Sequence, residues 1–95
     1  MVRYVVLTEF TEKGAQSIKQ STSRAHAFAR AAAKSGVTIE NHFWTLGRYD
    51  GVLILSGQKE EQVIHCLALL SAAGFVRTES LRAFSDEEFD AITGA

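Results

Sequence analysis

Four stretches of the chain are rich in aliphatic, β-branched and aromatic residues, a composition that predicts β-strands. The middle of the stretch Val2–Phe10 and the stretch Val52–Leu55 are apolar at both odd and even positions, which is typical of central strands that are covered on both faces. The stretch Val37–Leu46 alternates polar and apolar residues and is expected to be half exposed. The stretch Phe75–Phe84 alternates in the same way and is typical of an edge strand.

A long helix is predicted between the first two strands. The segment Glu12–Ser35 repeats small or apolar residues at steps of three and four, which places them on one face of a helix. Thr11 stands where an N-cap is expected and Gly36 stands where a helix would end. We therefore expect one helix to run between these two residues.

Two further helices are predicted in the second half of the chain. The segment Lys59–Gly74 begins with acidic residues and ends with glycine, and from Cys66 onward it is apolar almost all round. This excess of apolar surface indicates that the helix contacts something besides the sheet. Ser85 precedes Glu88 by three residues, which is the spacing of a capping box and predicts a short C-terminal helix.

Two glycines, Gly47 and Gly51, flank a three-residue segment between the second and third strands, and they predict a hairpin because glycine adopts positive φ without strain. The run Leu46–Asp50, followed by an apolar strand, resembles the signature of the GYD domain family, which is named for its Gly-x-Tyr-Asp turn. The family's length matches the whole chain, and its members are similar small proteins of largely unknown biochemical function. The resemblance implies a fold and an oligomeric habit, and it transfers only Gly47, Tyr49 and Asp50, without a catalytic role.

The order of the predicted elements is βαββαβ, which in a chain of this length indicates one ferredoxin-like α+β domain over residues 1–95. In that arrangement the sheet has four antiparallel strands, with Val2–Phe10 and Val52–Leu55 in the centre. Because both crossovers are right-handed, the two long helices are expected on one face of the sheet.

The other face of this sheet is left without helices. The central strands are apolar on both parities, so a face bearing either Tyr4 and Val6 or Val5 and Leu7 would be exposed to water. A second copy of the chain most simply covers that face. We therefore expect a homodimer or higher oligomer of the dimeric α+β barrel type, which the chain resembles in element order and size.

The composition argues against several classes of partner. Ten Lys and Arg residues nearly balance eleven Asp and Glu residues, so no basic surface for nucleic acid or an anionic membrane is expected. No apolar stretch approaches the roughly 20 residues that span a bilayer. The lone cysteine, Cys66, and the absence of a leader-like N-terminal pattern predict a cytoplasmic protein.

Glu40, His42 and Trp44 share one parity of the second strand and are the main candidates for a site. If Ile39 and Phe43 face the helices, these three side chains line the open face, where a dimer would enclose a cavity. There His42 could move a proton as the catalytic residue while Trp44 and Glu40 bind a polar aromatic or keto acid ligand. Alternatively, His42 and Trp44 only fill the dimer interface. A one-residue shift of register would exchange His42 and Trp44 with Phe43.

Tyr4, Tyr49 and Asp50 are the remaining candidates for ligand binding. Tyr49 and Asp50 either form a lip over the cavity or serve the turn itself. In the second case the Asp50 carboxylate bonds nearby backbone N–H groups and Tyr49 packs on a neighbouring subunit. Tyr4 joins the site if its side of the first strand is the open one.

Metal and nucleotide sites are not expected. The three histidines, His26, His42 and His65, lack metal-ligand spacing, and no Gly-x-Gly-x-x-Gly or P-loop pattern occurs. Cys66 lies in an apolar helical run without an adjacent cation and is expected to be inert. We therefore expect no cofactor.

Three functions remain open. The uncovered sheet face and the lack of a catalytic pattern favour a self-associating, non-enzymatic domain that binds a small organic ligand or a protein partner. The alternative is a cofactor-independent enzyme of the dimeric α+β barrel type, an oxygenase, isomerase or decyclase for a small polar organic compound, which rests on analogy of fold. A regulatory domain that senses metabolites is the third, and it predicts that ligand binding shifts the oligomer distribution.

Overall fold

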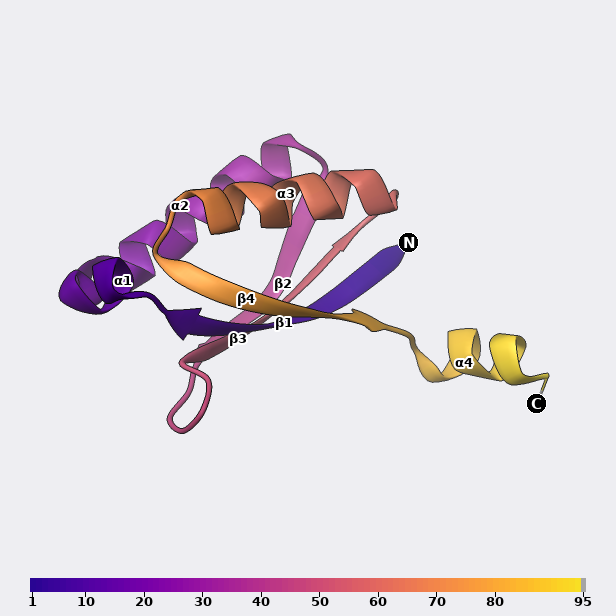
Figure 1. Ribbon diagram of the computed structural model, residues 1–95. Coiled ribbons are helices and arrows are strands. Elements are labelled where there is room, and N and C mark those ends of the chain that lie inside the picture. The colour runs from indigo at the N-terminus through magenta and orange to yellow at the C-terminus, as the bar shows by residue number, and fades with distance from the viewer. Residues whose placement is uncertain (95) are drawn as a thin grey trace.

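A computed structural model describes residues 1–94 of the chain (Figure 1). Its strands and long helices follow the predicted order. The elements are β1 (Val2–Phe10), α1 (Glu12–Gln16), the 3-10 helix η1 (Ile18–Gln20), α2 (Ser21–Lys34), β2 (Val37–Trp44), β3 (Gly51–Gly57), α3 (Glu60–Ala72), β4 (Val76–Ala83) and α4 (Asp86–Thr93). The strand order is β2-β3-β1-β4, and all neighbouring strands are antiparallel. The prediction of a ferredoxin-like sheet with β1 and β3 in the centre is confirmed.

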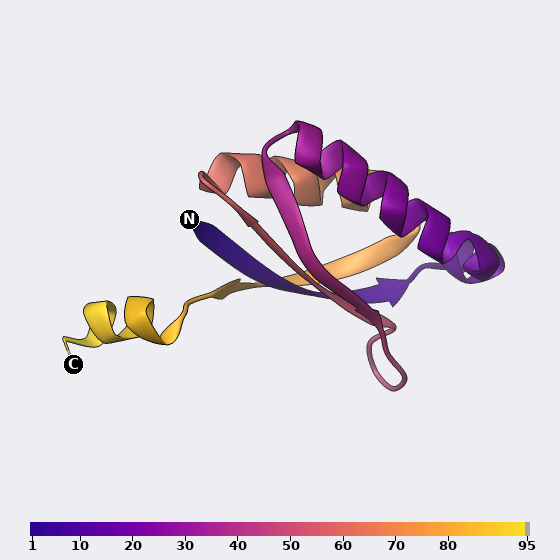
Figure 2. The same ribbon diagram turned by 180° about the vertical axis from the view of Figure 1, so that it is seen from behind.

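Helices α2 and α3 lie on the same face of the sheet, as both views of the ribbon show (Figures 1 and 2). The opposite face has no helix within residues 1–94, and we call it the open face. Val6 of β1 pairs with Leu53 of β3, and both are buried on the helix side. The next residues on each strand, Leu7 and Val52, pair with one another on the open face and are only partly buried.

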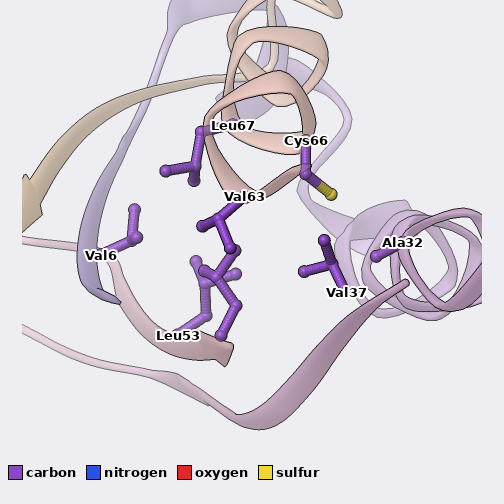
Figure 3. Packing of buried hydrophobic residues seen from close by; sticks show 8 residues of the cluster. Val6, Ala32, Val37, Leu53, Val63, Cys66 and Leu67 are labelled. Carbon is purple, nitrogen blue, oxygen red and sulfur yellow. The ribbon is translucent and has the colours of Figure 1, made fainter. Parts of the chain in front are cut away.

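The core lies between α3, β1 and β3, and the end of α2 closes it (Figure 3). Its buried hydrophobic members are Val6, Ala32, Val37, Leu53, Leu55, Val63, Cys66 and Leu67. The strand residues of this set occupy alternate positions, because successive side chains on a strand point to opposite faces. The apolar stripe of α3 therefore meets one parity of the two central strands.

The prediction of one helix over Glu12–Ser35 is wrong, because the segment breaks into α1, η1 and α2. The cause is a close contact with Phe75, the residue just before β4: a Cβ at Gly14 would collide with its carbonyl oxygen, and the Thr11 amide donates to that same oxygen at 3.0 Å. These contacts fix the direction of α1. The chain then turns at Ser17, whose φ of −115° is not helical, before α2 begins. The predicted ends are confirmed, since Thr11 caps α1 and the chain turns at Gly36 with a φ of 81° after α2.

A β-bulge interrupts the pairing of β2 with β3. Ile39 pairs with Leu55 but Asn41 pairs with Ile54, so Glu40 is an extra residue on β2. The bulge reverses which side chains of β2 face the helices from that point onward. His42 consequently pairs with Leu53 on the helix side.

Helix α4 follows the edge strand β4 and extends away from the sheet and the other helices (Figures 1 and 2). The predicted capping box is confirmed: the Glu88 amide donates to Ser85 Oγ at 3.2 Å, and the Ser85 amide donates to Glu88 Oε1 at 2.8 Å. No side chain of α4, all of which lies in the described range, is buried. No helix of residues 1–94 has the length and apolar character needed to cross a membrane.

Candidate functional site

A cavity of about 430 Å³ lies between α2, α3 and the covered face of the sheet. Helix α2 lines it with one face whose members recur at three- and four-residue steps: Arg24, Ala25, Phe28, Ala31, Ala32 and Ser35. Most of these side chains are small. The two helices therefore leave space between them over the sheet where larger residues would have filled it.

The remaining walls are mostly apolar. Helix α3 contributes Cys66, Leu69 and Leu70, and Phe10 and Leu53 rise from the sheet. Leu69 is among the residues that made the second half of this helix unexpectedly apolar, so the cavity accounts for part of that excess. A concave, largely apolar site of this size is typical of sites for small organic molecules.

His42 and Trp44 form a flat section of the wall at the end of β2. Their rings stack with centroids 4.3 Å apart and an interplanar angle of 14°. The expectation that Glu40, His42 and Trp44 share the open face is wrong, because the bulge turns His42 and Trp44 toward the helices. Glu40 remains on the open face, where it accepts hydrogen bonds from Arg3 Nε at 2.8 Å and from Ser56 Oγ at 2.9 Å.

The environment of His42 favours its neutral form. Burial lowers the pKa of the imidazole, because the charged form loses its hydration, and Coulomb repulsion between its charged form and His26 lowers it further. At neutral pH the ring therefore presents one nitrogen that can accept a proton or a hydrogen bond and one that can donate. It is a polar group on an otherwise apolar section of the cavity.

The charged side chains that line the cavity, Arg24 and Asp50, are already held by the protein. Arg24 Nη1 donates to the Ser17 carbonyl oxygen at 3.0 Å, and its guanidinium lies over the Phe75 ring at 4.2 Å from the centroid. Asp50 Oδ2 accepts a hydrogen bond from the Phe10 amide at 2.8 Å. The cavity therefore offers a charged ligand little compensation for its lost hydration.

Cys66 lies in the wall of the cavity but is not poised for chemistry. Its side chain is buried, and burial raises the pKa of the thiol, so the thiolate is disfavoured. Within residues 1–94 no three His, Cys, Asp or Glu side chains come together as a metal site would require.

The turn between β2 and β3 is hydrogen-bonded to the other two strands, β1 and β4. The Asp50 amide donates to the Thr8 carbonyl oxygen at 2.8 Å, and the Thr45 amide donates to the Asp50 carbonyl oxygen at 2.9 Å. Tyr49 Oη donates to Glu79 Oε1 on β4 at 2.9 Å. Asp50 thus serves the turn and the strand end with both backbone and carboxylate, and it also borders the cavity, whereas Tyr49 lies outside it.

Tyr4 also lies outside the cavity, although it is on the helix side of β1. Its hydroxyl donates to Glu60 at the start of α3, and Glu60 Oε1 accepts a second hydrogen bond from Arg82 Nε at 2.9 Å. Of the six residues that the sequence singled out, the structure brings together His42, Trp44 and Asp50 at the cavity. Glu40, Tyr4 and Tyr49 lie outside the cavity.

Sequence reasoning missed the lining face of α2. A stripe of small residues at helical spacing was visible in the sequence, but it is equally typical of a helix packed closely on a sheet. Its role depends on the distance between α2 and α3, which no pattern within one helix specifies.

The chain is similar to a known family and to solved structures. The model of the GYD domain matches residues 4–93. A protein of Thermus thermophilus with a known crystal structure is similar, with 24% identity, a TM-score of 0.55, and coverage of 90% of this chain and 95% of that one. A protein from an uncultured marine organism, described as a dimeric ferredoxin-like protein, has 9% identity, a TM-score of 0.50 and the same coverage of both chains. No curated protein matches the chain significantly.

Proposed function

This chain belongs to the GYD domain family, and from that premise we propose that it is a self-associating domain that binds a small, planar and largely apolar organic molecule between α2 and α3. The observation that carries the proposal is the cavity of about 430 Å³ with the stacked His42 and Trp44 rings in its wall. Helix α2 faces this cavity with small residues, so the space is open to a ligand.

The ligand class follows from the chemistry of the walls. Apolar side chains dominate, so transfer of an apolar molecule from water into the cavity is favourable by roughly 25 cal/mol per Å² that becomes buried. The indole face of Trp44 favours a flat, preferably aromatic partner. Neutral His42 can form one hydrogen bond with a hydroxyl or carbonyl group, whereas a charged ligand would find Arg24 and Asp50 already occupied.

Self-association is supported by the open face of the sheet. Its centre is formed by apolar side chains of β1 and β3, and it continues at the edges with Phe43, 55% exposed, and Leu81, 46% exposed. An apolar face of this kind is typical of an interface between protein chains. A second copy of the chain presents the same surface, as a two-fold dimer requires. The marine protein with this fold is itself described as dimeric.

The binding site can be tested with the protein's own fluorescence, because Trp44 is the only tryptophan in the chain. We expect 2-naphthol, a planar apolar probe with one hydroxyl group, to change the Trp44 emission in a saturable manner. Ala31→Phe places a large ring in the lining face of α2 and should weaken binding at least about tenfold, a difference of roughly 1.4 kcal/mol.

Ala33→Phe is the matched control, because Ala33 lies two residues along the same helix, is exposed and does not line the cavity. It should bind the probe as the unmodified protein does. Absence of saturable binding up to the solubility limit of the probe, or equal binding by the Ala31→Phe and Ala33→Phe variants, would contradict the proposed site.

The neutral imidazole of His42 favours a second candidate function, a cofactor-independent enzyme that acts on the same class of ligand as an oxygenase, isomerase or decyclase. A histidine kept unprotonated in a largely apolar cavity is suited to accept a proton from a bound molecule. A compound that purifies with the protein should then be converted on incubation with it. His42→Gln should still bind that compound but leave it unchanged, as mass spectrometry of the mixture would show.

A further inference from the structure

Helix α4 exposes an apolar face that nothing within residues 1–94 covers. Phe89 is 56% exposed and Ile92 is 62% exposed, and they lie three residues apart on one face of the helix. The helix has eight residues, closed by its capping box and by Gly94 with a φ of 79°. Helices this short are unstable in water unless an apolar face packs on a surface. The apolar face of this formed helix is therefore left exposed within residues 1–94.

The turn between β2 and β3 exposes a complementary surface. Leu46 is fully exposed, and Arg48 is exposed beside it. The turn projects from the sheet on the side away from α2 and α3, in both views of the ribbon (Figures 1 and 2). This is the side on which a second copy would cover the open face.

From these surfaces we propose that α4 of each copy packs against the turn of residues 45–50 of a second copy. The proposal rests on the proposed self-association through the open face. Phe89 and Ile92 then pack on Leu46 of the partner copy, and the acidic residues of α4 face Arg48. The two-fold symmetry forms this contact at both ends of the dimer, and we call the contact between α4 and the partner's turn the clasp.

The position of the two surfaces in the fold supports this pairing. The turn is next to Gly51, which pairs with Thr8 at the end of β1, whereas α4 follows Ala83, which pairs with Arg3 at the beginning of β1. The two surfaces therefore lie at opposite ends of the sheet. A two-fold axis that runs across the strands, between two facing sheets, exchanges these ends, so each α4 lies at the end of the dimer where the turn of the other copy projects. Because the symmetry repeats every contact, the clasp forms twice.

Charge favours the same pairing. Helix α4 carries four acidic residues and no basic one. Asp86, Glu87 and Glu88 lie in its first turn, and Asp90 follows. The turn contributes Arg48, whereas Arg77 at the same end of the sheet already pairs with Glu9 at 3.9 Å. Opposite charges around an apolar contact favour this orientation of the two copies and disfavour a contact between two α4 helices, which would bring like charges together.

A second copy is favoured over an unrelated protein because α4 is continuous with the open face. It follows directly from β4, whose Leu81 and Ala83 pair with Val5 and Arg3 on that face. Whatever covers the open face is therefore adjacent to α4. The copy that is proposed to cover it presents Leu46 and Arg48 at the matching end.

The test is cross-linking between copies of a Leu46→Cys/Ile92→Cys double variant with a short bis-maleimide. Since the two positions lie at opposite ends of the sheet in one copy, a link between them joins two copies, and we expect a covalent dimer on a denaturing gel. The single variants Leu46→Cys and Ile92→Cys should stay monomeric on that gel. The parent protein controls for its native cysteine, Cys66, which is buried. The variant Ile18→Cys/Ile92→Cys, with an exposed residue of η1 instead of the turn, should also stay monomeric.

Native mass spectrometry of the untreated double variant separates failure of this inference from failure of the proposed self-association. If the protein is a dimer but gives no covalent product, the clasp is overturned while self-association stands. The same holds if the Ile92→Cys variant alone cross-links equally. A monomer at all concentrations would overturn both. A dimer that links only in the Leu46→Cys/Ile92→Cys variant supports the clasp.

Discussion

His42 combines a polar ring with a largely apolar position, and this determines what it can do. Its imidazole stacks on Trp44 at the edge of the cavity, and burial together with Coulomb repulsion from His26 lowers its pKa. The pKa of His42 is therefore lower in the folded protein than in the unfolded chain, where it has its ordinary value. This difference links protonation of a single residue to the stability of the fold.

The sign of that linkage gives a prediction about pH. The pKa of His42 in the unfolded chain is close to the ordinary value of 6.5 and is lower in the folded protein, so acid protonates the unfolded state first. The contribution of His42 to the free energy of unfolding is present above about pH 6.5 and declines below it. The slope is at most about 1.4 kcal/mol per pH unit, the value for one proton. Urea unfolding between pH 7.5 and 5.5 should show this loss.

The His42→Gln variant isolates the contribution of this residue. Its stability should fall less over the same pH range than that of the unmodified protein, because glutamine does not titrate. Parallel curves for the two proteins would show that protonation of His42 is not coupled to folding.

Glu40 shows why the site could be predicted only in part. The residue types in β2 identified His42 and Trp44, but their face depended on a bulge that the alternating pattern does not reveal. The bulged residue is held by Arg3 and Ser56, which lie on two other strands. Contacts between residues so distant in the sequence fix the register, and the sequence pattern of one strand does not predict such contacts.

At the scale of the elements, the local signals in the sequence were sufficient for most boundaries. Thr11 and Ser85 cap helices as predicted, and the strands apolar on both parities are the central ones. The break between α1 and α2 was not predictable, because it depends on the approach of Gly14 to Phe75, the residue just before β4. The cavity likewise depends on how far apart α2 and α3 lie.

The contact at Gly14 leads to a prediction about stability. Gly14→Ala would ordinarily favour a helix, but here the added methyl group meets the carbonyl oxygen of Phe75 and the ring of Phe10. We expect it to lower the free energy of unfolding by about 1–3 kcal/mol, the usual cost of overpacking. Thermal unfolding measured by circular dichroism would show the change.

Gln16→Ala is the control, since Gln16 is exposed on the same helix. It should change stability by less than about 0.5 kcal/mol, as is usual at exposed sites. A Gly14→Ala variant that is as stable as the unmodified protein would show that the two segments do not pack as described.

For the molecule as a whole, the two faces of the sheet have different roles in our account. The helix side holds the core and the cavity, whereas the open side presents apolar residues from all four strands. A chain of 95 residues has a modest core, so a second copy that covers the open face adds buried apolar surface that one chain does not provide.

This division predicts the effect of charge on the open face. Phe43→Glu combined with Leu81→Glu should raise the dimer Kd at least about 100-fold, because each lost apolar contact costs about 1.5–3 kcal/mol. Both side chains are exposed in one chain, so the fold should persist. Sedimentation equilibrium measures the change in Kd. Ile64→Glu, at an exposed position of α3, is the control and should leave the dimer intact.

The most direct test of the central claim, that the helix side binds a ligand while the open side binds a second copy, is a two-dimensional NMR titration of the protein with 2-naphthol. We expect amide shifts to change at cavity positions such as Phe28, Ala31 and His42. Changes centred on Val5 and Ile54 of the open face, or no change up to the solubility limit of the probe, would contradict the claim.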